Sequence, residues 1–401
     1  MARVTCLSYR DLRVERLAVL TALALQTASQ GTAQSTSRTA ITVDATTEAA
    51  SNPLLRSGKD NGAVIAELSI MPQYKVTDER GNTLDLDAVA TVRSYSRLYP
   101  TYVLGSVTAV RGFRQSERLS GTATLGVVRD LPVDLPTTGI DALVAPQSIR
   151  TTINGAANLE WRPDSRTTIA PAISALRATY GGDTVLRATR SGQAQLAYGR
   201  LVAARTTIGF RPLFAISQTA GQPTLERYAL VGTVEHGLSS VMRLNFDLGV
   251  EYLPAVRDAR LQTASRGAAT YVVGSLRLCR ETLRLDACIA GELGSQVSAL
   301  DGFQRARSLH TSVSYRLDER KTLAVLLDYQ RISAPRGQAA LSAAGGGRFE
   351  AGSALARMSW RLTPTLTGSG EAGYIMRRSD IVGRVRSSYV GLRLRLEPRL
   401  R

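Results

Sequence analysis

The sequence contains very little lysine, histidine or cysteine. Only three of its fifty basic residues are lysines, it has two histidines and three cysteines, and aromatic residues make up 5% of the chain. The formal charge of +17 therefore comes almost wholly from arginine, which is spread along the chain and alternates with leucine. Proteins that bind nucleic acid instead cluster their basic residues and place aromatic residues among them. The sequence predicts no nucleic-acid partner, and a GC-rich genome that favours arginine codons explains the bias more simply.

Motifs for catalysis and metal binding are absent as well. Neither His236 nor His310 has further metal ligands at a suitable spacing. A barrel hydrolase would need a serine, a histidine and an orienting partner at the lipid surface, whereas the strand pattern described below places His310 on the opposite face. No glycine-rich phosphate loop is present. We therefore expect no enzymatic activity, no cofactor and no metal.

Long hydrophobic runs are also lacking. At 401 residues the chain could hold two or three soluble domains or one large barrel, and no apolar run after the N-terminal region reaches the 18 or so residues of a membrane-spanning helix. Near the N-terminus, four arginines precede a short apolar run at 17–25, and small residues follow at 31–33. This pattern predicts an export signal at 1–33 and a mature domain at 34–401.

The most regular pattern in the chain is a strict alternation at 242–252. Apolar residues occupy every even position and polar residues or glycine every odd position, which is the signature of a strand with two different faces. Eleven residues at roughly 3.3 Å each, tilted by about 45°, would cross the hydrocarbon core of a bilayer. The apolar positions are Met242, Leu244, Phe246, Leu248, Val250 and Tyr252.

The alternation recurs almost to the end of the chain and predicts about eighteen strands (16–18). They are expected at residues 40–49, 62–78, 83–97, 101–115, 119–130, 148–162, 166–179, 187–200, 205–218, 225–236, 241–253, 268–279, 282–295, 306–318, 321–333, 349–362, 365–377 and 385–397.

The connections between these strands alternate in length. Tight turns are expected at 78–82, 162–165, 236–239, 317–320 and 362–365. Longer connections are expected at 131–147, 180–186, 218–224, 254–267, 296–305, 334–348 and 378–384. Short periplasmic turns and longer extracellular loops are typical of outer-membrane barrels. The predicted fold is therefore all-β, a transmembrane antiparallel up-and-down β-barrel with both termini in the periplasm, and a soluble all-β sugar-binding protein is disfavoured.

The same alternation assigns charged residues of both signs to the barrel interior. Such residues either line a pore and set its selectivity or fill the wall as salt-bridge networks, and the sequence gives these two interpretations about equal weight. A barrel of this size is wide enough for an aqueous channel. The predicted inward residues are Glu67, Asp85, Asp87, Arg93, Glu160, Arg243, Asp247, Glu251, Arg277, Arg284, Asp286, Glu292, Arg357, Glu371, Arg393 and Arg395.

Aromatic residues take outward positions near predicted strand ends. Amphipathic rings at the membrane–water interfaces form such a girdle in membrane barrels, whereas ordinary core packing is the alternative explanation. The predicted girdle consists of Tyr74, Trp161, Tyr252, Tyr315, Trp360 and Tyr374.

Two cysteines flank one predicted tight turn. Cys279 and Cys288 have the inward parity of their strands, and the periplasm is oxidising, which suggests a disulfide across the hairpin. The alternative is two small buried residues that the register sets diagonally apart. The third cysteine, Cys6, lies in the predicted signal.

A family resemblance enters at 51–72. The segments Ser-Asn-Pro-Leu at 51–54 and Ala-Val-Ile-Ala-Glu-Leu-Ser-Ile-Met-Pro at 63–72 resemble the start of a family of outer-membrane β-barrel porins. That family occurs in alpha-proteobacteria and related groups, often beside exopolysaccharide biosynthesis and secretion genes. The resemblance implies an outer-membrane barrel and, in some members, a part in polysaccharide export. The final residues depart from the family, whose last strand usually ends on an aromatic residue.

We therefore expect a porin-like outer-membrane channel, serving either exopolysaccharide export or passive diffusion of small charged solutes. The alternative function is a non-conducting barrel that docks partners of a polysaccharide secretion system. Expected partners are outer-membrane lipid and lipopolysaccharide, the outer-membrane insertion machinery, components of polysaccharide secretion and a second copy of the chain in a homo-oligomer. Three other classes of outer-membrane barrel are disfavoured. A TonB-dependent receptor would need a plug, an assembly factor would need periplasmic repeats, and an autotransporter would need a passenger domain.

Overall fold

A computed structural model describes most of the chain. The described residues are 36–56, 58, 60–132, 147–182, 186–257, 264–298, 302–333, 349–379 and 383–398. The predicted export signal at 1–33 and the third cysteine, Cys6, lie outside these residues. Among the described residues, no helix is long and apolar enough to cross a membrane.

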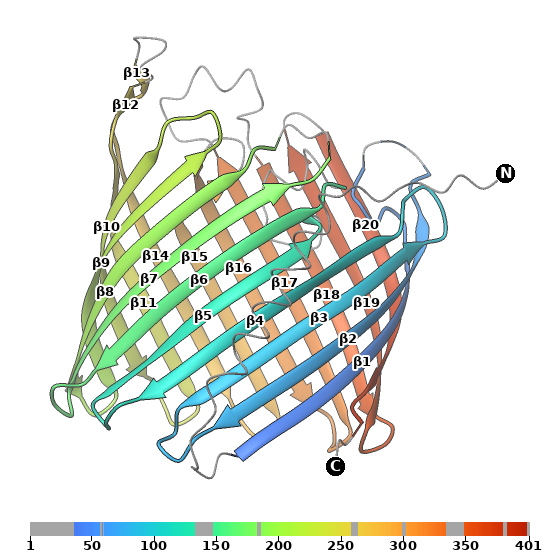
Figure 1. The fold of residues 1–401 in the computed structure, drawn as a ribbon, viewed down its shortest axis with the longest axis horizontal. Helices are drawn as coiled ribbons and strands as arrows, with labels where there is room; N and C mark the ends of the chain where they lie inside the picture. Colours follow the sequence, from blue (N-terminus) through green and yellow to red (C-terminus); the bar gives the residue numbers. More distant parts are fainter. Residues whose placement is uncertain are drawn as a thin grey trace, which may run out of the picture.

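Eighteen long strands form one sheet, and a small two-stranded hairpin projects from one edge (Figure 1). The long strands are β1 (Thr36–Ala50), β2 (Ala63–Thr77), β3 (Thr83–Tyr95), β4 (Tyr102–Arg114), β5 (Leu119–Asp130), β6 (Arg150–Trp161), β7 (Thr167–Tyr180), β8 (Thr189–Ala203), β9 (Thr206–Thr219), β10 (Leu225–Gly237), β11 (Met242–Leu253), β14 (Ala269–Glu281), β15 (Leu285–Ser298), β16 (Gly302–Arg316), β17 (Lys321–Ser333), β18 (Phe349–Arg361), β19 (Leu366–Ser379) and β20 (Gly383–Leu396). The hairpin consists of β12 (Val256–Arg257) and β13 (Ala264–Arg266).

The sheet closes on itself. Each long strand pairs antiparallel with its neighbours in the chain, and β1 pairs with β2 on one side and with β20 on the other. Closure leaves no free edge, as a strand barrel in a membrane requires. The predicted antiparallel up-and-down barrel of about eighteen strands is confirmed. One predicted loop was wrong: most of 296–305 is strand, because β15 and β16 continue pairing as far as Ser298 and Gly302.

The outward face carries the apolar rows that the alternation predicted. On β11, for example, Leu248 and Val250 are 54% and 53% exposed, and Leu230, opposite Val250 on β10, is 54% exposed. Monomeric soluble proteins rarely expose apolar patches of this extent, because such patches favour association or aggregation. The barrel wall instead presents an apolar band around its circumference.

Short turns at one edge of the barrel are held by aspartate side chains. Asp78 accepts hydrogen bonds from the side chain and backbone of Asn82 and from the backbone of Arg80, which lower the pKa of its carboxyl group. Gly81 supplies the positive φ of 79° in this turn. In the turn after β6, backbone N–H groups of Arg166 and Thr167 likewise lower the pKa of Asp164. This chemistry explains why the sequence predicts this edge well.

At the opposite edge, an apolar cluster fills part of the interior. It joins the β1–β2 connection and the ends of β2–β5 to strands β16–β20 on the facing wall. Leu54 and Phe349, from these two sides, are each only 1% exposed. The buried members are Leu54, Leu55, Ala63, Tyr99, Tyr102, Leu104, Leu131, Ile332, Phe349, Ala351 and Val385. The core of this barrel therefore sits between opposite walls at the long-loop edge.

Candidate solute cavity in the barrel interior

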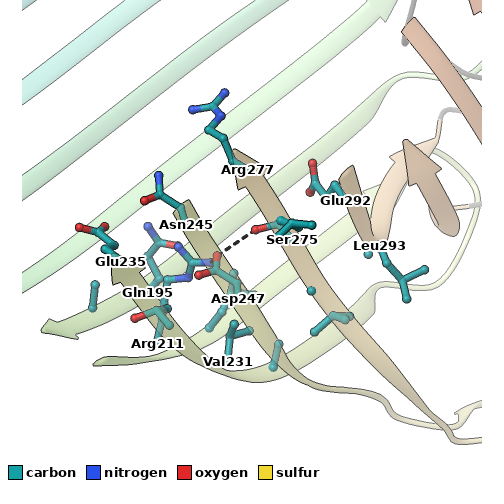
Figure 2. A pocket seen from close by; sticks show the side chains of 18 of the residues that line it. Gln195, Arg211, Val231, Glu235, Asn245, Asp247, Ser275, Arg277, Glu292 and Leu293 are labelled. Carbon is teal, nitrogen blue, oxygen red and sulfur yellow. Dashed lines mark hydrogen bonds and ion pairs between the residues drawn. The ribbon is translucent and has the colours of Figure 1, made fainter. Parts of the chain in front are cut away.

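The other half of the interior is hollow. A cavity of about 1180 Å³ is lined by inward side chains from β6 through β11 and from β14 through β16. Figure 2 shows charged and amide side chains projecting into it from adjacent strands, among them Arg211, Glu235, Asn245, Asp247, Arg277 and Glu292. The volume suits a small solute. Carboxylates and guanidinium groups of both signs meet in this space.

A break in the strand ladder shapes the end of this cavity that lies toward the long-loop edge. The pairing of β14 with β15 runs from Glu281 and Asp286 only as far as Gly274 and Leu293. Beyond that point β14 continues to pair with β11, while β15 continues with β16 alone. The ends of β15 and β16 therefore lean away from β14 as a hairpin, and residues of β16 come within 8 Å of β9, Cα to Cα.

The leaning hairpin, formed by the ends of β15 and β16, is anchored on the inner face of β10 and β11. Arg227 of β10 donates a hydrogen bond of 2.7 Å to the carbonyl oxygen of Ser295 on β15. The Ser295 hydroxyl donates to Glu251 of β11. The Arg227–Ser295 contact lines both the large cavity and a smaller one of about 330 Å³, so it partitions them.

Glu251 is the centre of this anchor. Its side chain is only 2% exposed and lies 3.4 Å from Arg227 and 3.8 Å from Arg305. Arg305 in turn donates to the backbone oxygen of Val272, a carbonyl that the β15 ladder does not reach, and stacks over the ring of Tyr271 at 4.6 Å. A buried carboxylate needs such partners, because an unpaired one would carry a large desolvation penalty. The hairpin therefore stays in place by polar contacts.

Most of the predicted inward charges form ion pairs in the wall. Glu67 pairs with Arg93 at 2.8 Å, and Arg357 pairs with Glu371 at 2.8 Å. Further pairs join Asp85 to Lys75, Glu160 to Arg162, Asp247 to Arg211, Glu251 to Arg227 and Arg305, and Arg393 and Arg395 to Asp44. These are the salt-bridge networks that the sequence offered as one of its two interpretations.

A smaller set of the predicted residues makes no ion pair with a described residue. Of these, Arg277 and Glu292 line the large cavity, and Arg277 extends away from the Asp247–Ser275 hydrogen bond in Figure 2. Arg243 and Asp286 share the face of the cysteines near the short-turn edge, and Asp87 shares the face of Asp85. Arg277 and Glu292 are thus the predicted charges that face the large cavity without an ion pair to a described residue.

Arg284 differs from its predicted position. It lies in the short turn between β14 and β15, exposed, whereas an inward place on a strand was expected. The reason is local: the Thr282 hydroxyl accepts a hydrogen bond from the backbone N–H of Leu285, which fixes the turn at 282–284. β14 therefore runs two residues further than the predicted end at 279.

The two cysteines are joined. Cys279 on β14 and Cys288 on β15 are direct cross-strand partners with a Cα–Cα distance of 4.1 Å, and the structure has a disulfide between them. The bridge lies where β14 and β15 are still paired, on the short-turn side of the point at which β15 leaves β14. It fastens the base of the leaning hairpin to the wall.

The predicted girdle residues occupy outward positions. Trp161 ends β6, and Trp360 lies one residue from the end of β18, where its ring packs over Gly368 and Gly370 on β19. Tyr74 and Tyr315 lie toward the same short-turn edge, and Tyr252 and Tyr374 lie toward the other. Their role at a membrane interface stays a prediction.

Sequence reasoning missed several residues of the cavity. Arg211 and Arg227 have inward parity on β9 and β10, so a stricter use of the alternation would have found them. Ser295 and Arg305 could not be found this way, because alternation places both on the outward face. They reach the interior only because the hairpin leans across the inner face of β10, β11 and β14.

No protein-family model matches the chain, and no curated protein is similar to it in sequence. Several solved structures have a similar fold. The structure of Pseudomonas aeruginosa OprD is 11% identical with a TM-score of 0.44, covering 90% of this chain and 96% of that one. Pseudomonas aeruginosa OccK8 (OprE) is 9% identical with a TM-score of 0.47, covering 91% and 98%.

The ferric citrate transporter FecA in its unliganded form is 13% identical with a TM-score of 0.45, covering 84% of this chain. The chain spans 60% of the length of FecA. The closed antiparallel strand pairing of the chain itself defines the barrel.

Proposed function

We propose that the chain is an outer-membrane channel that admits small charged solutes. The observation that carries this proposal is the polar cavity of about 1180 Å³, in which Arg277, Glu235 and Glu292 make no ion pair with a described residue. Charged groups of both signs at a constriction set ion and solute selectivity. The cavity therefore supplies both space and recognition.

A location in the outer membrane is supported by the outward face and by the connections. The outward side chains form an apolar band, and short turns gather at one edge while longer connections gather at the other. The short-turn edge would face the periplasm. β1 starts and β20 ends at that same edge, which would place both ends of the barrel in the periplasm.

The obstruction of the interior favours small solutes over polymers. The apolar cluster occupies one half at the long-loop edge, and the anchored hairpin narrows the other half. An exopolysaccharide chain would need both to move, whereas an ion or small metabolite needs only the hairpin contact to loosen. Polysaccharide export is thus the less favoured form of the proposal.

The same obstruction favours a second candidate function. A barrel closed by the cluster and the hairpin could work without conducting, by docking components of a secretion system at its edges. The two candidates differ in one property, the flow of ions through the folded barrel.

Single-channel recording in a planar bilayer, with a salt gradient across it, separates the candidates. The channel function predicts steady openings, and Glu251→Gln should raise conductance because it weakens the contacts to Arg227, Arg305 and Ser295. Glu235→Gln removes the same charge from the cavity wall away from the hairpin and should alter selectivity without enlarging the opening. Silence from both variants, in protein shown to be folded by heat-shifted gel mobility, would support the docking function.

A substitution pair tests the membrane assignment. Leu248→Arg places a charge on the outward face at mid-strand, where lipid exposure would cost about 2–4 kcal/mol. Asn245→Arg places the same charge in the polar cavity. We expect the first to block outer-membrane assembly and the second to assemble. Equal assembly of both would contradict the proposed lipid face.

A further inference from the structure

A row of charged residues crosses five adjacent strands on the outward face. The register aligns Arg307 of β16 with Arg331 of β17, Arg331 with Glu350 of β18, Glu350 with Arg378 of β19, and Arg378 with Arg384 of β20. We call these five residues the arginine row. It carries four positive charges and one negative charge at a single level of the barrel.

All five members share the parity of the outward apolar residues. Leu309 on β16 and Tyr329 on β17 are exposed outward residues. Arg307 and Arg331 each lie two positions away on the same strand and therefore have the same parity. Arg307, Arg378 and Arg384 are exposed. The side chains of Arg331, Glu350, Arg378 and Arg384, on strands outside the leaning hairpin, therefore project away from the lumen. None of the five residues lines the solute cavity.

Among the described residues, the positive charges of the row exceed the negative charges paired with them. Arg331 lies 3.9 Å from Glu350, which is the one ion pair among the five. Arg307, Arg378 and Arg384 make no ion pair with a described residue. Arginines placed directly opposite each other, as Arg307 and Arg331 or Arg378 and Arg384 are, destabilise a strand pair. A bound anion would remove this repulsion.

The level of the row matches a lipid headgroup region. Glu350 lies ten residues from Trp360 along β18, about 34 Å of strand. With a tilt of 35–45°, this separation corresponds to roughly 25 Å across the barrel wall, the usual height of the apolar band. If Trp360 marks the periplasmic interface, the row lies at the outer-leaflet interface, on the long-loop side.

A second arginine pair occurs on another part of the wall. Arg177 of β7 and Arg190 of β8 are direct cross-strand partners, outward and exposed. Arg177 also aligns with Ile153 on β6, eight residues from Trp161 at the short-turn end of that strand. The repetition of opposed outward arginines at about the same level argues against a chance placement.

We propose that the arginine row binds the phosphate groups of lipid headgroups in the outer leaflet, as lipopolysaccharide would present them. Guanidinium groups bind phosphate oxygens in a bidentate geometry, and several converging arginines complement a phosphate-bearing headgroup whose acyl chains lie along the apolar band below. This inference rests on the proposed outer-membrane location. It assigns the row to a lipid partner and leaves the solute cavity unaffected.

The test is binding of defined lipids to the purified full-length barrel in detergent, measured by native mass spectrometry. The probes are diphosphoryl lipid A and the same lipid after chemical dephosphorylation. The wild-type barrel should bind the phosphorylated form about tenfold more tightly, which is about 1.4 kcal/mol. The double variant Arg378→Gln and Arg384→Gln should lose this preference.

A matched control removes two arginines at the other edge. Arg80→Gln with Arg320→Gln deletes the same charge from exposed short turns and should keep the tenfold preference. Heat-shifted gel mobility verifies that each variant is folded, and the row variant should fold because it removes repulsion. The inference is overturned if the row variant keeps the full preference, if the wild type binds both lipids equally, or if the row variant changes only the oligomeric state.

These outcomes are separable from failure of the proposed function. A barrel that inserts and conducts but shows no phosphate preference overturns the inference about the row alone. Equal assembly of Leu248→Arg and Asn245→Arg would instead remove the membrane location on which the inference rests.

Discussion

The two halves of the barrel interior are closed by different kinds of contact. Between β2–β5 and β16–β20, opposite walls meet through apolar side chains, and Leu54 and Phe349 are almost completely buried. Between β7 and β15 the walls stay apart, and a leaning hairpin narrows the space through Glu251, Arg227 and Ser295. One half is a packed core and the other is a polar cavity with a partition.

This difference predicts where the interior can open. Burying a large apolar side chain contributes about 1.5–3 kcal/mol, so separating the cluster would expose many such groups together. The hairpin contacts are few, and polar groups released from them can bind water that enters the cavity. Local opening favours regions with few buried apolar contacts. In the proposed channel, the hairpin would therefore control solute passage while the cluster stays closed.

The largest expected effect comes from truncating the same residue type in each half. Leu54→Ala removes a side chain that is 1% exposed in the cluster and should lower the free energy of unfolding by about 3 kcal/mol. Leu213→Ala removes one that is only partly buried, between a small apolar cluster and the open cavity, and should cost about 1 kcal/mol because less apolar surface is lost from burial. Denaturant unfolding in detergent measures both. Equal losses would remove the distinction between core and cavity.

Breaking the disulfide should affect the hollow half selectively. Cys279 and Cys288 close a short loop at the base of the leaning hairpin, and loss of the bridge should cost about 2–3 kcal/mol by the chain-entropy estimate. Cys279→Ser with Cys288→Ser should increase hydrogen exchange in β14 and β15 while leaving β18 and β19 unchanged. A free-thiol assay on the oxidised protein should find neither residue reactive, and two reactive thiols would contradict the bridge.

A smaller effect is expected at the break in the ladder. Arg305→Ala removes the side-chain hydrogen bond to the Val272 oxygen and one partner of Glu251, at a cost of about 2 kcal/mol. Amide exchange should rise at the end of β15 and in the adjoining part of β14. Arg93→Ala, which breaks an ion pair between β2 and β3 away from the hairpin, is the control and should leave these strands unchanged. Similar exchange in both variants would contradict the anchoring role of Arg305.

The fold could be predicted because its main determinant is local in sequence. Alternation along each strand records which side chains face outward, and residues 242–252 show this without exception. Turn residues such as Asp78 and Gly81 mark one edge, since their side-chain bonds and positive φ are local properties. Strand number and order then follow, because each strand pairs with its neighbour in the chain.

The site could be predicted only in part because it depends on contacts between distant segments. Alternation identified Glu251 as inward, yet it could not say that Arg305, with outward parity, would pair with it. That contact exists because the β14–β15 ladder stops at Gly274, and the place where a ladder stops depends on packing across the barrel. The apolar cluster likewise joins residues from both ends of the chain, such as Leu54 and Phe349, which no periodicity connects.

The smallest expected effect is a change in stability with pH at the short-turn edge. This edge belongs to both halves of the barrel. The pKa of Asp164 is lowered by the backbone hydrogen bonds from Arg166 and Thr167. Stabilisation from a lowered pKa is present above the unfolded value near 3.9 and is lost as the pH falls through the lower folded value. Trp161 lies three residues away, so its fluorescence, recorded with Trp360→Phe, should change below about pH 4. Asp164→Asn can still accept both hydrogen bonds but cannot titrate, so it should abolish the change. If the fluorescence change persists in Asp164→Asn, another group causes it. If the change is lost while Leu54→Ala and Leu213→Ala still differ in unfolding free energy by the same amount, the stability of the turn is independent of how the interior is closed.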